Sequence, residues 1–174
     1  MNGMTRERVA ETLRNYRRNV SRWKHLQVLM EEYERWAEEE EQKAMAEDAL
    51  RGHSLTGMPR AGGTSSPVED LVGKYMDGYV PPMVRGLREE IEAMRKERES
   101  RRRCIRYVDG WLECLPTRER TVIEKQMIEG LQWSEVEKQT EIEFGIPFSR
   151  AGLKRMKERG LAKIYAVAGV AESA

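Results

Sequence analysis

The segment from Ser149 to Tyr165 concentrates side chains that bind anions. It contains six Lys and Arg residues and a single acid, Glu158. Arg150, Lys154 and Lys157 are spaced at i, i+4 and i+7, which places them on one outer face of a helix. Ammonium and guanidinium groups in such a row bind phosphate, and Arg also forms paired hydrogen bonds to base edges. The chemistry indicated is recognition of a nucleic acid.

The charge of the whole chain gives no such signal. Its 174 residues include 31 Lys and Arg against 30 Asp and Glu, for a formal net charge of +1. A basic partner surface must therefore be inferred from local clustering. A second cluster, from Arg95 to Arg106, has seven Lys and Arg residues and two acids. This cluster can contact DNA phosphates or pair with the acidic end of the first long helix, and we favour the pairing.

Other kinds of chemistry find no support in the sequence. No His/Cys/Asp cluster, glycine-rich phosphate loop or carboxylate pair has a catalytic spacing, so no enzyme, cofactor or metal is expected. Cys104 and Cys114 lack a CxxC motif and are expected to be reduced thiols, and His25 and His53 suggest no metal cluster. No apolar run approaches the roughly 20 residues that span a bilayer, which predicts a cytoplasmic protein without a membrane partner.

The basic segment lies in a predicted helical unit at residues 115–165. The first helix of this unit has an apolar face and ends at Gly130, since a left-handed glycine commonly closes a helix. That face comprises Val122, Ile123, Met127 and Ile128. Ser134 and Glu137 form a Ser-x-x-Glu capping box, which predicts the start of a second helix. A helix, a glycine turn and a capped helix are the beginning of a helix-turn-helix unit.

The third predicted helix, residues 149–165, opens at Ser149 and completes this unit. Its inward stripe consists of Leu153, Met156, Leu161 and Ile164. A basic helix that closes a helix-turn-helix unit fits the major groove of double-stranded DNA. The residues expected to contact DNA are Ser134, Ser149, Arg150, Lys154, Arg155 and Lys157.

The rest of the chain predicts two long helices, which makes the fold all-α. Neither Gly nor Pro occurs between Met4 and Gly52, and apolar residues recur there at steps of three and four. The predicted divisions are one long N-terminal helix in 1–50, a Gly/Pro/Ser-rich loop in 51–67, a short helix plus a second long helix in 68–114, the helix-turn-helix unit in 115–165 and a tail in 166–174.

Each long helix has one apolar stripe near the heptad period, so the two are expected to form an antiparallel hairpin or coiled coil. If residue 50 lies opposite residue 83, three acids of the first helix face three arginines of the second. These are Glu31, Glu32 and Glu34, and Arg101, Arg102 and Arg103. The stripes can also pair between two molecules, so a homo-oligomer formed through the long helices stays open as an alternative or an addition.

Ten residues of the C-terminal unit occur in an order with a known parallel. They are Leu115, Glu119, Arg120, Gly130, Trp133, Ser134, Glu135, Val136, Ser149 and Arg150. In this order they resemble region four of bacterial sigma factors, the domain that recognises promoters. The resemblance implies a helix-turn-helix fold whose third helix binds DNA.

Two features depart from the region-four pattern. Glu137 stands where that family usually has a small residue that lets the helices approach closely. The stretch before Ser149, QTEIEFGIPF, is longer than the usual tight turn. Two interpretations are open: either the four large apolar residues of this stretch extend the core, or the second helix is longer. These residues are Ile142, Phe144, Ile146 and Phe148.

The short motifs at Gly57–Arg60 and Pro67–Glu69 follow one long helix and precede another helix and the sigma-like unit. This layout is similar to that of phage-encoded transcriptional regulators of the RinA/ArpU kind. The similarity implies activation of late or packaging genes in phages and prophages of Gram-positive bacteria, within the host cytoplasm. RNA polymerase is then an additional candidate partner. The alternative is a helical interaction or assembly protein, either an adaptor that docks on RNA polymerase or a packaging protein like a phage terminase small subunit.

Overall fold

The computed structural model of the chain describes residues 4–52, 73 and 78–170, and its regular structure is helical. The helices are α1 (Arg6–Arg14), α2 (Tyr16–Gly52), α4 (Pro82–Glu113), α5 (Thr117–Ile123), the π-helical turn η1 (Glu124–Ile128), α6 (Trp133–Phe144) and α7 (Arg150–Val167). The described residues contain no strand, which confirms the predicted all-α class. Among these helices, none combines the length and the apolar character that crossing a membrane requires.

Part of the predicted organisation lies outside the described residues. The predicted loop in 51–67 lies outside the described residues from position 53 onward, while Arg51 and Gly52 belong to α2. The start of the short helix that was expected near residue 68 also lies outside them. The second long helix was expected from about 82 to 114, and α4 confirms it. The tail begins later than predicted, because α7 continues to Val167.

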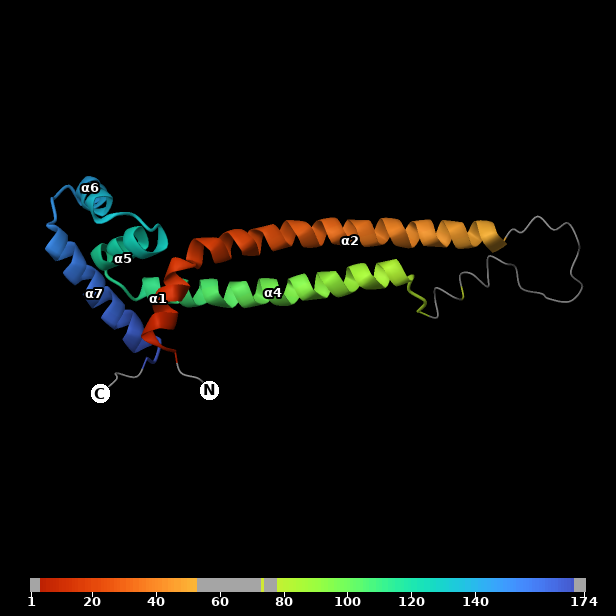
Figure 1. Cartoon of the computed structure of the whole chain (residues 1–174), viewed down its shortest axis with the longest axis horizontal. Helices are drawn as coiled ribbons and strands as arrows, with labels where there is room; N and C mark the ends of the chain where they lie inside the picture. The colour runs from red at the N-terminus through yellow and green to blue at the C-terminus, as the bar shows by residue number, and fades with distance from the viewer. Residues whose placement is uncertain (1–3, 53–72, 74–77, 171–174) are drawn as a thin grey trace, which may run out of the picture. The chain divides into compact units, whose positions relative to one another are not determined.

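The chain divides into two compact units (Figure 1). The first, which we call the head unit, combines residues 1–24 with residues 98–174, and the second, the hairpin unit, comprises residues 25–97. Helices α2 and α4 each contribute one end to the head unit and the other to the hairpin unit. The predicted compact domain comprised residues 115–165 alone. The contribution of residues 1–24 to this domain was not predicted.

The single long helix that was predicted from residue 5 to about residue 50 is interrupted at Asn15. This residue adopts φ −85° and ψ 0°, outside the α-helical region, so it ends α1 before α2 begins at Tyr16. Asn is among the weaker helix formers and tolerates this bridge conformation. Thr5 begins α1, because its hydroxyl accepts a hydrogen bond from the backbone N–H of Arg8 at 3.3 Å.

The core of the head unit is built from both ends of the chain. Its buried members are Val9, Leu13, Val108, Trp111, Leu112, Leu115, Ile123, Met127 and Ile164. Val9 and Leu13, both in α1, are fully buried in it. Burial of such an aliphatic side chain contributes about 1.5–3 kcal/mol. The C-terminal helices therefore share their core with α1 and with the end of α4.

In the hairpin unit, α2 and α4 run antiparallel, as predicted (Figure 1). The contact is an apolar seam in which Ala37, Val84 and Leu87 are buried and Tyr33 and Val80 pack against them. Two exposed ion pairs flank the seam. Arg88 and Glu41 are 3.0 Å apart, and Arg95 and Glu34 are 3.5 Å apart.

These ion pairs correct the predicted register. With residue 50 opposite residue 83, Glu34 lies opposite residue 99, because 50 + 83 − 34 = 99; in the structure it pairs with Arg95. Arg101, which was expected to face Glu31–Glu34, instead donates to Asn19 in the head unit at 3.0 Å. The apolar seam decides the register, since each exposed ion pair contributes only about 0.2–1 kcal/mol.

The basic cluster from Arg95 to Arg106 was expected to pair with the acidic end of the first long helix, and Arg95 does pair with an acid of that helix, Glu34. Other members of the cluster make different contacts. Arg98 lies over the ring of Trp23 at 4.9 Å, and Arg102 pairs with Glu99 of its own helix at 3.8 Å.

Gly160 marks the closest approach of α7 to α5. It is buried, and a Cβ atom added there would lie 2.6 Å from the Cδ1 atom of Ile123, which is itself fully buried. We expect Gly160→Ala to lower the free energy of unfolding by about 1–3 kcal/mol, the usual effect of overpacking a core. Urea unfolding followed by circular dichroism measures this change.

Gly110→Ala is the matched control. Gly110 lies on the exposed side of α4, and an added Cβ meets nothing within 4 Å. This substitution should raise the free energy of unfolding by up to about 1 kcal/mol, because Ala is the better helix former. Similar stabilisation by both substitutions would contradict the tight contact at Gly160.

Candidate nucleic-acid interface

The first helix of the predicted helix-turn-helix unit consists of α5 and the π-helical turn η1. The N–H of Glu129 donates to the carbonyl of Glu124 at 2.8 Å, the i to i−5 pattern of a π-turn. Gly130 follows with φ +73°, which confirms its predicted role at the helix end. Leu131 and Trp133 pack against the cluster of Val122, Val136 and Leu153.

Helix α6 begins two residues earlier than predicted. Its N-cap is Gln132, and the capping box pairs Gln132 with Glu135, whose Oε2 atom accepts from the Gln132 backbone N–H at 2.9 Å. Ser134 is therefore an exposed residue of the first turn, not the cap. The carboxylate of Glu137, which was expected to complete a box with Ser134, instead binds Arg150 of α7.

Helix α6 is long, and it ends at Gly145 with φ +68°. Ile142 is 83 % exposed and Ile146 is 42 % exposed, so these two residues do not extend the core. The rings of Phe144 and Phe148 meet edge to face at 6.0 Å, and Arg118 lies over both. The second helix is therefore longer, as one of the two open interpretations had it. The other interpretation holds for Phe148, which packs against the core cluster of Val122, Val136 and Leu153.

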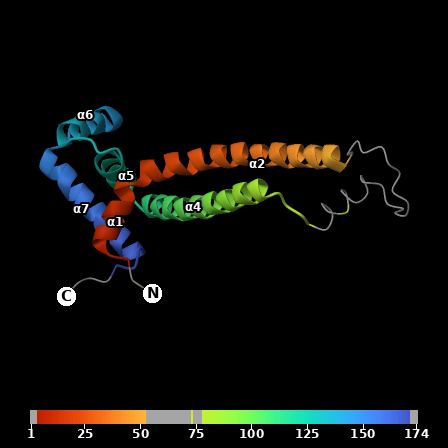
Figure 2. The ribbon, with the colours of Figure 1, turned by 45° about the vertical axis from the view of Figure 1, so that its right-hand side comes forward.

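Helix α7 begins at the predicted cap. The Ser149 hydroxyl accepts from the backbone N–H of Gly152 at 3.2 Å. Leu153 and Ile164 are fully buried, and α5, α6 and α7 pack against one another (Figures 1 and 2). This packing fixes which side of α7 is open to solvent.

The predicted contact residues separate into two groups. Five of them are exposed, namely Ser134, Ser149, Arg150, Lys154 and Arg155. The sixth, Lys157, is half-buried, with its ammonium group 5.8 Å from the centre of the Trp133 ring. Burial lowers the pKa of Lys157, and the positive charge of Arg14 in α1 lowers this pKa further. The expectation of an outward-facing Lys157 is corrected, because position 157 lies beside the buried positions 153 and 160.

Arg150 is held at the start of α7 by an acid of α6. Its Nε atom donates to Oε1 of Glu137 at 2.9 Å, and this hydrogen bond raises the pKa of Arg150. Glu137 thus serves as an anchor for Arg150.

Two further basic residues of α7 fasten the helix to α5. Lys163 donates to Oε2 of Glu119 at 2.8 Å, and Arg159 lies 3.6 Å from the other carboxylate oxygen. Glu119 is buried, and the two cations compensate for the burial of its charge. Both residues belong to the basic segment identified in the sequence, but their ion pairs with Glu119 were not predicted.

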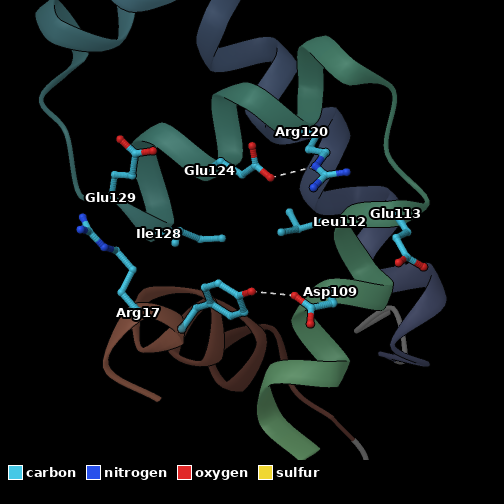
Figure 3. A pocket seen from close by; sticks show the side chains of 9 residues that line it. Arg17, Asp109, Leu112, Glu113, Arg120, Glu124, Ile128 and Glu129 are labelled. Atoms are coloured by element: carbon cyan, nitrogen blue, oxygen red, sulfur yellow. Dashed lines mark hydrogen bonds and ion pairs between the residues drawn. The ribbon is translucent and has the colours of Figure 1, made fainter. Parts of the chain in front are cut away.

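An open pocket of about 700 Å³ lies in the head unit between α2, α4 and the α5–η1 segment (Figure 3). The hydroxyl of Tyr16 donates to Oδ1 of Asp109 at 2.7 Å, and Arg120 pairs with Glu124 at 2.8 Å. Partial burial and the hydrogen bond to Asp109 raise the pKa of Tyr16 to about 12. The pocket walls carry both charges, which gives it no clear preference for anions.

Within residues 4–52, 73 and 78–170, no three His, Cys, Asp or Glu side chains are grouped as metal ligands. Cys104 and Cys114 are free thiols, and the Cys114 thiol donates to the carbonyl of Trp111 at 2.9 Å.

Comparison with known proteins adds no relative: no family model, no curated protein and no solved structure matches the chain.

The Tyr16–Asp109 hydrogen bond should make stability depend on alkaline pH. An unfolded tyrosine has a pKa of about 10, whereas in the folded protein the Tyr16 pKa is about 12. The stabilisation is therefore complete below about pH 10 and is lost as the pH rises through about 12. We expect Tyr16→Phe to be less stable than the parent at neutral pH, by about 1 kcal/mol.

This difference should shrink between about pH 10 and pH 12, where tyrosine in the unfolded chain is ionised while Tyr16 in the folded protein is still neutral. Urea unfolding midpoints of both proteins across this range provide the measurement. Asp109→Asn keeps an acceptor oxygen but removes the negative charge beside Tyr16. In this variant the pKa of Tyr16 should therefore be lower than in the parent. A difference between parent and Tyr16→Phe that stays constant with pH would contradict the assignment.

Proposed function

We propose that this protein is a sequence-specific DNA-binding transcriptional regulator whose helix α7 enters the major groove of double-stranded DNA. The observation that carries the proposal is the exposed basic start of α7 in a chain whose net charge is only +1. This start includes the Ser149 cap and the side chains of Arg150, Lys154 and Arg155. Helix-turn-helix proteins use the N-terminal residues of their third helix in this way.

The exposed residues have different proposed roles. Lys154 and Arg155 stand on the solvent side of α7, where they can contact base edges or the adjoining phosphates. Ala151 and Ala162 are exposed on the same helix, and such small side chains allow the backbone to approach a groove closely. Ser134 at the start of α6 is suited to a phosphate contact, since hydroxyl groups and helix N-termini commonly bind the DNA backbone.

The biological setting follows the resemblance noted in the sequence. We propose a regulator of the RinA/ArpU kind, encoded by a phage or prophage, that activates late or packaging genes in the cytoplasm of a bacterial host. RNA polymerase is the proposed protein partner in that role. What supports this setting is the layout of long helices ahead of a sigma-like unit.

A second candidate function is a helical interaction or assembly protein, such as a polymerase-docking adaptor or a terminase small-subunit-like packaging protein. The observation in its favour is the exposure of large apolar side chains on the hairpin unit: Val28, Trp36, Met45, Tyr79 and Met83. Assembly through these residues would give a homo-oligomer. Sedimentation at several protein concentrations tests this assembly, since a concentration-independent monomer removes the packaging-protein form of the candidate.

Loss of the two outermost cations should impair DNA binding. After selection of bound sequences from a random duplex pool, Lys154→Ala/Arg155→Ala should bind the selected duplex about 10- to 100-fold more weakly. This range corresponds to about 1–3 kcal/mol for a lost base contact. The slope of log affinity against log salt should also become shallower, because fewer counterions are released.

The matched control is Arg35→Ala/Arg85→Ala, which removes two exposed positive charges from the hairpin unit. It should leave DNA affinity within about twofold of the parent, since neither residue belongs to the proposed contact set and a side chain that contacts no phosphate releases no counterions. Equal affinities of parent, α7 variant and control for the selected duplex would refute the proposed placement of α7.

Glu137 should affect discrimination more than affinity. Glu137→Ala releases the Arg150 guanidinium from its hydrogen bond at the start of α7. We expect the ratio of affinities for selected and scrambled duplexes to fall about two- to fivefold, in line with about 0.2–1 kcal/mol for an exposed ion pair. Glu137→Gln keeps an acceptor oxygen, so its ratio of affinities should lie between those of the parent and Glu137→Ala. An unchanged ratio in Glu137→Ala would show that Arg150 needs no orientation by α6.

A further inference from the structure

Helix α1 is joined to α2 by a bend at a single residue, Asn15 (Figures 1 and 2). Helical hydrogen bonds nevertheless reach this residue from both sides. Its N–H donates to the carbonyl of Glu11 at 2.9 Å, and its carbonyl accepts from the N–H of Asn19 at 2.8 Å. A change of ψ at Asn15 from 0° to the helical value of about −42° therefore brings α1 and α2 into one straight helix. Neither Gly nor Pro occurs between Met4 and Gly52 to oppose this straight form.

Helix α1 packs into the head unit through apolar side chains. Val9 and Leu13 are fully buried in a core cluster to which α4, α5, η1 and α7 also contribute. At the other end of α1, Arg6 lies over the ring of Tyr165 in α7 at 5.5 Å. Apolar burial is not directional, and an identical helix from a second molecule can provide all of these contacts.

The start of α2 is fastened in a different way, by hydrogen bonds to α4. The hydroxyl of Tyr16 donates to Asp109 at 2.7 Å, and the side chain of Asn19 accepts from Arg101 at 3.0 Å. These bonds lie after the bend, so they do not have to break when α1 moves. The bend at Asn15 thus separates an apolar segment, which can leave the head unit, from a hydrogen-bonded segment that stays in it.

We propose that α1 exchanges between two copies of this chain, so that each head unit is completed by α1 of the other molecule. With Asn15 straight, the nine residues of α1 project about 13 Å beyond α2 and out of their own head unit. The core contacts of α1 are re-formed in the dimer, because the exchanged helix is identical. The bend at Asn15 and the protein concentration then govern the balance between monomer and dimer. This surface differs from the exposed apolar residues of the hairpin unit, and the exchange does not require α7 to read DNA.

Two substitutions at Asn15 should move this balance in opposite directions. Asn15→Ala favours the straight helix and Asn15→Gly disfavours it, because Ala is the best helix former and Gly one of the poorest. After refolding from urea at high protein concentration, sedimentation should show dimer in the parent and a dimer dissociation constant about tenfold lower in Asn15→Ala, since the gain counts once for each of two bends. In Asn15→Gly the constant should be higher than in the parent. Equal constants in the two variants, or no dimer in any of the three proteins, would overturn the proposal.

Complementation between two damaged chains tests whether the dimer forms by exchange. Leu13→Asp places a charge at a fully buried position of α1, and Ile164→Asp does the same in α7. Neither chain alone can build an intact core. In an exchanged heterodimer, the unchanged α1 of the Ile164→Asp chain completes the unchanged C-terminal helices of the Leu13→Asp chain, so one of the two head units is intact. Near-UV circular dichroism reports this recovery, because Trp111 lies in the same core.

An equimolar mixture of the two chains, refolded together, should recover about half of the parent's near-UV signal, since one head unit in two is intact. The matched control is a mixture of Val9→Asp and Leu13→Asp, which should recover nothing because every α1 in it is damaged. A spectrum of the first mixture equal to the sum of its separate chains would show that α1 does not exchange. A dimer that sediments without recovery of the signal would assign pairing to the hairpin unit and would likewise overturn the proposal.

Discussion

The head unit depends on the burial of α1 against the C-terminal helices. Val9 and Leu13 are fully buried in one cluster with Trp111, Ile123 and Ile164. Each of these α1 side chains contributes about 1.5–3 kcal/mol, and a typical domain has a net stability of only about 5–15 kcal/mol. Without α1, the apolar faces of α4 and α7 would lie open to water. The C-terminal helices are therefore only part of a domain, and the N-terminal helix completes their core.

The same packing determines which cations of α7 are available to a partner. One flank of the helix is fastened to α5 through Glu119, which takes Lys163 and Arg159. On the other flank, Lys157 is half-buried beside Trp133. Half of the six basic residues in this segment thus hold the helix in place. Lys154 and Arg155 remain on the solvent side, so the segregation of charge in the sequence serves both folding and the proposed recognition.

Much of the fold could be predicted from local patterns, because periodicity, glycine turns and caps act over a few residues. The all-α class, the extent of α4, the Gly130 turn and the Ser149 cap were obtained in this way. The break at Asn15 was missed because its immediate neighbours continue the helical pattern, and the Gln132 cap was missed because Ser134 is the commoner type of cap. The outward position of Lys157 and the hairpin register were wrong because both are decided by tertiary packing, which spacing alone does not reveal. The predicted DNA contacts depend on a partner molecule, and the packing of the chain alone does not determine them.

The discontinuity of the head in sequence has a consequence for its synthesis. Val9 and Ile164 belong to one cluster although they are 164 − 9 = 155 positions apart. Contacts between such distant residues form late and slow folding, because the intervening chain must first be ordered. On the ribosome, α1 emerges early and has to wait, with its apolar face uncovered, until α7 has been translated. Such exposed intermediates are prone to aggregation and are natural clients of chaperones.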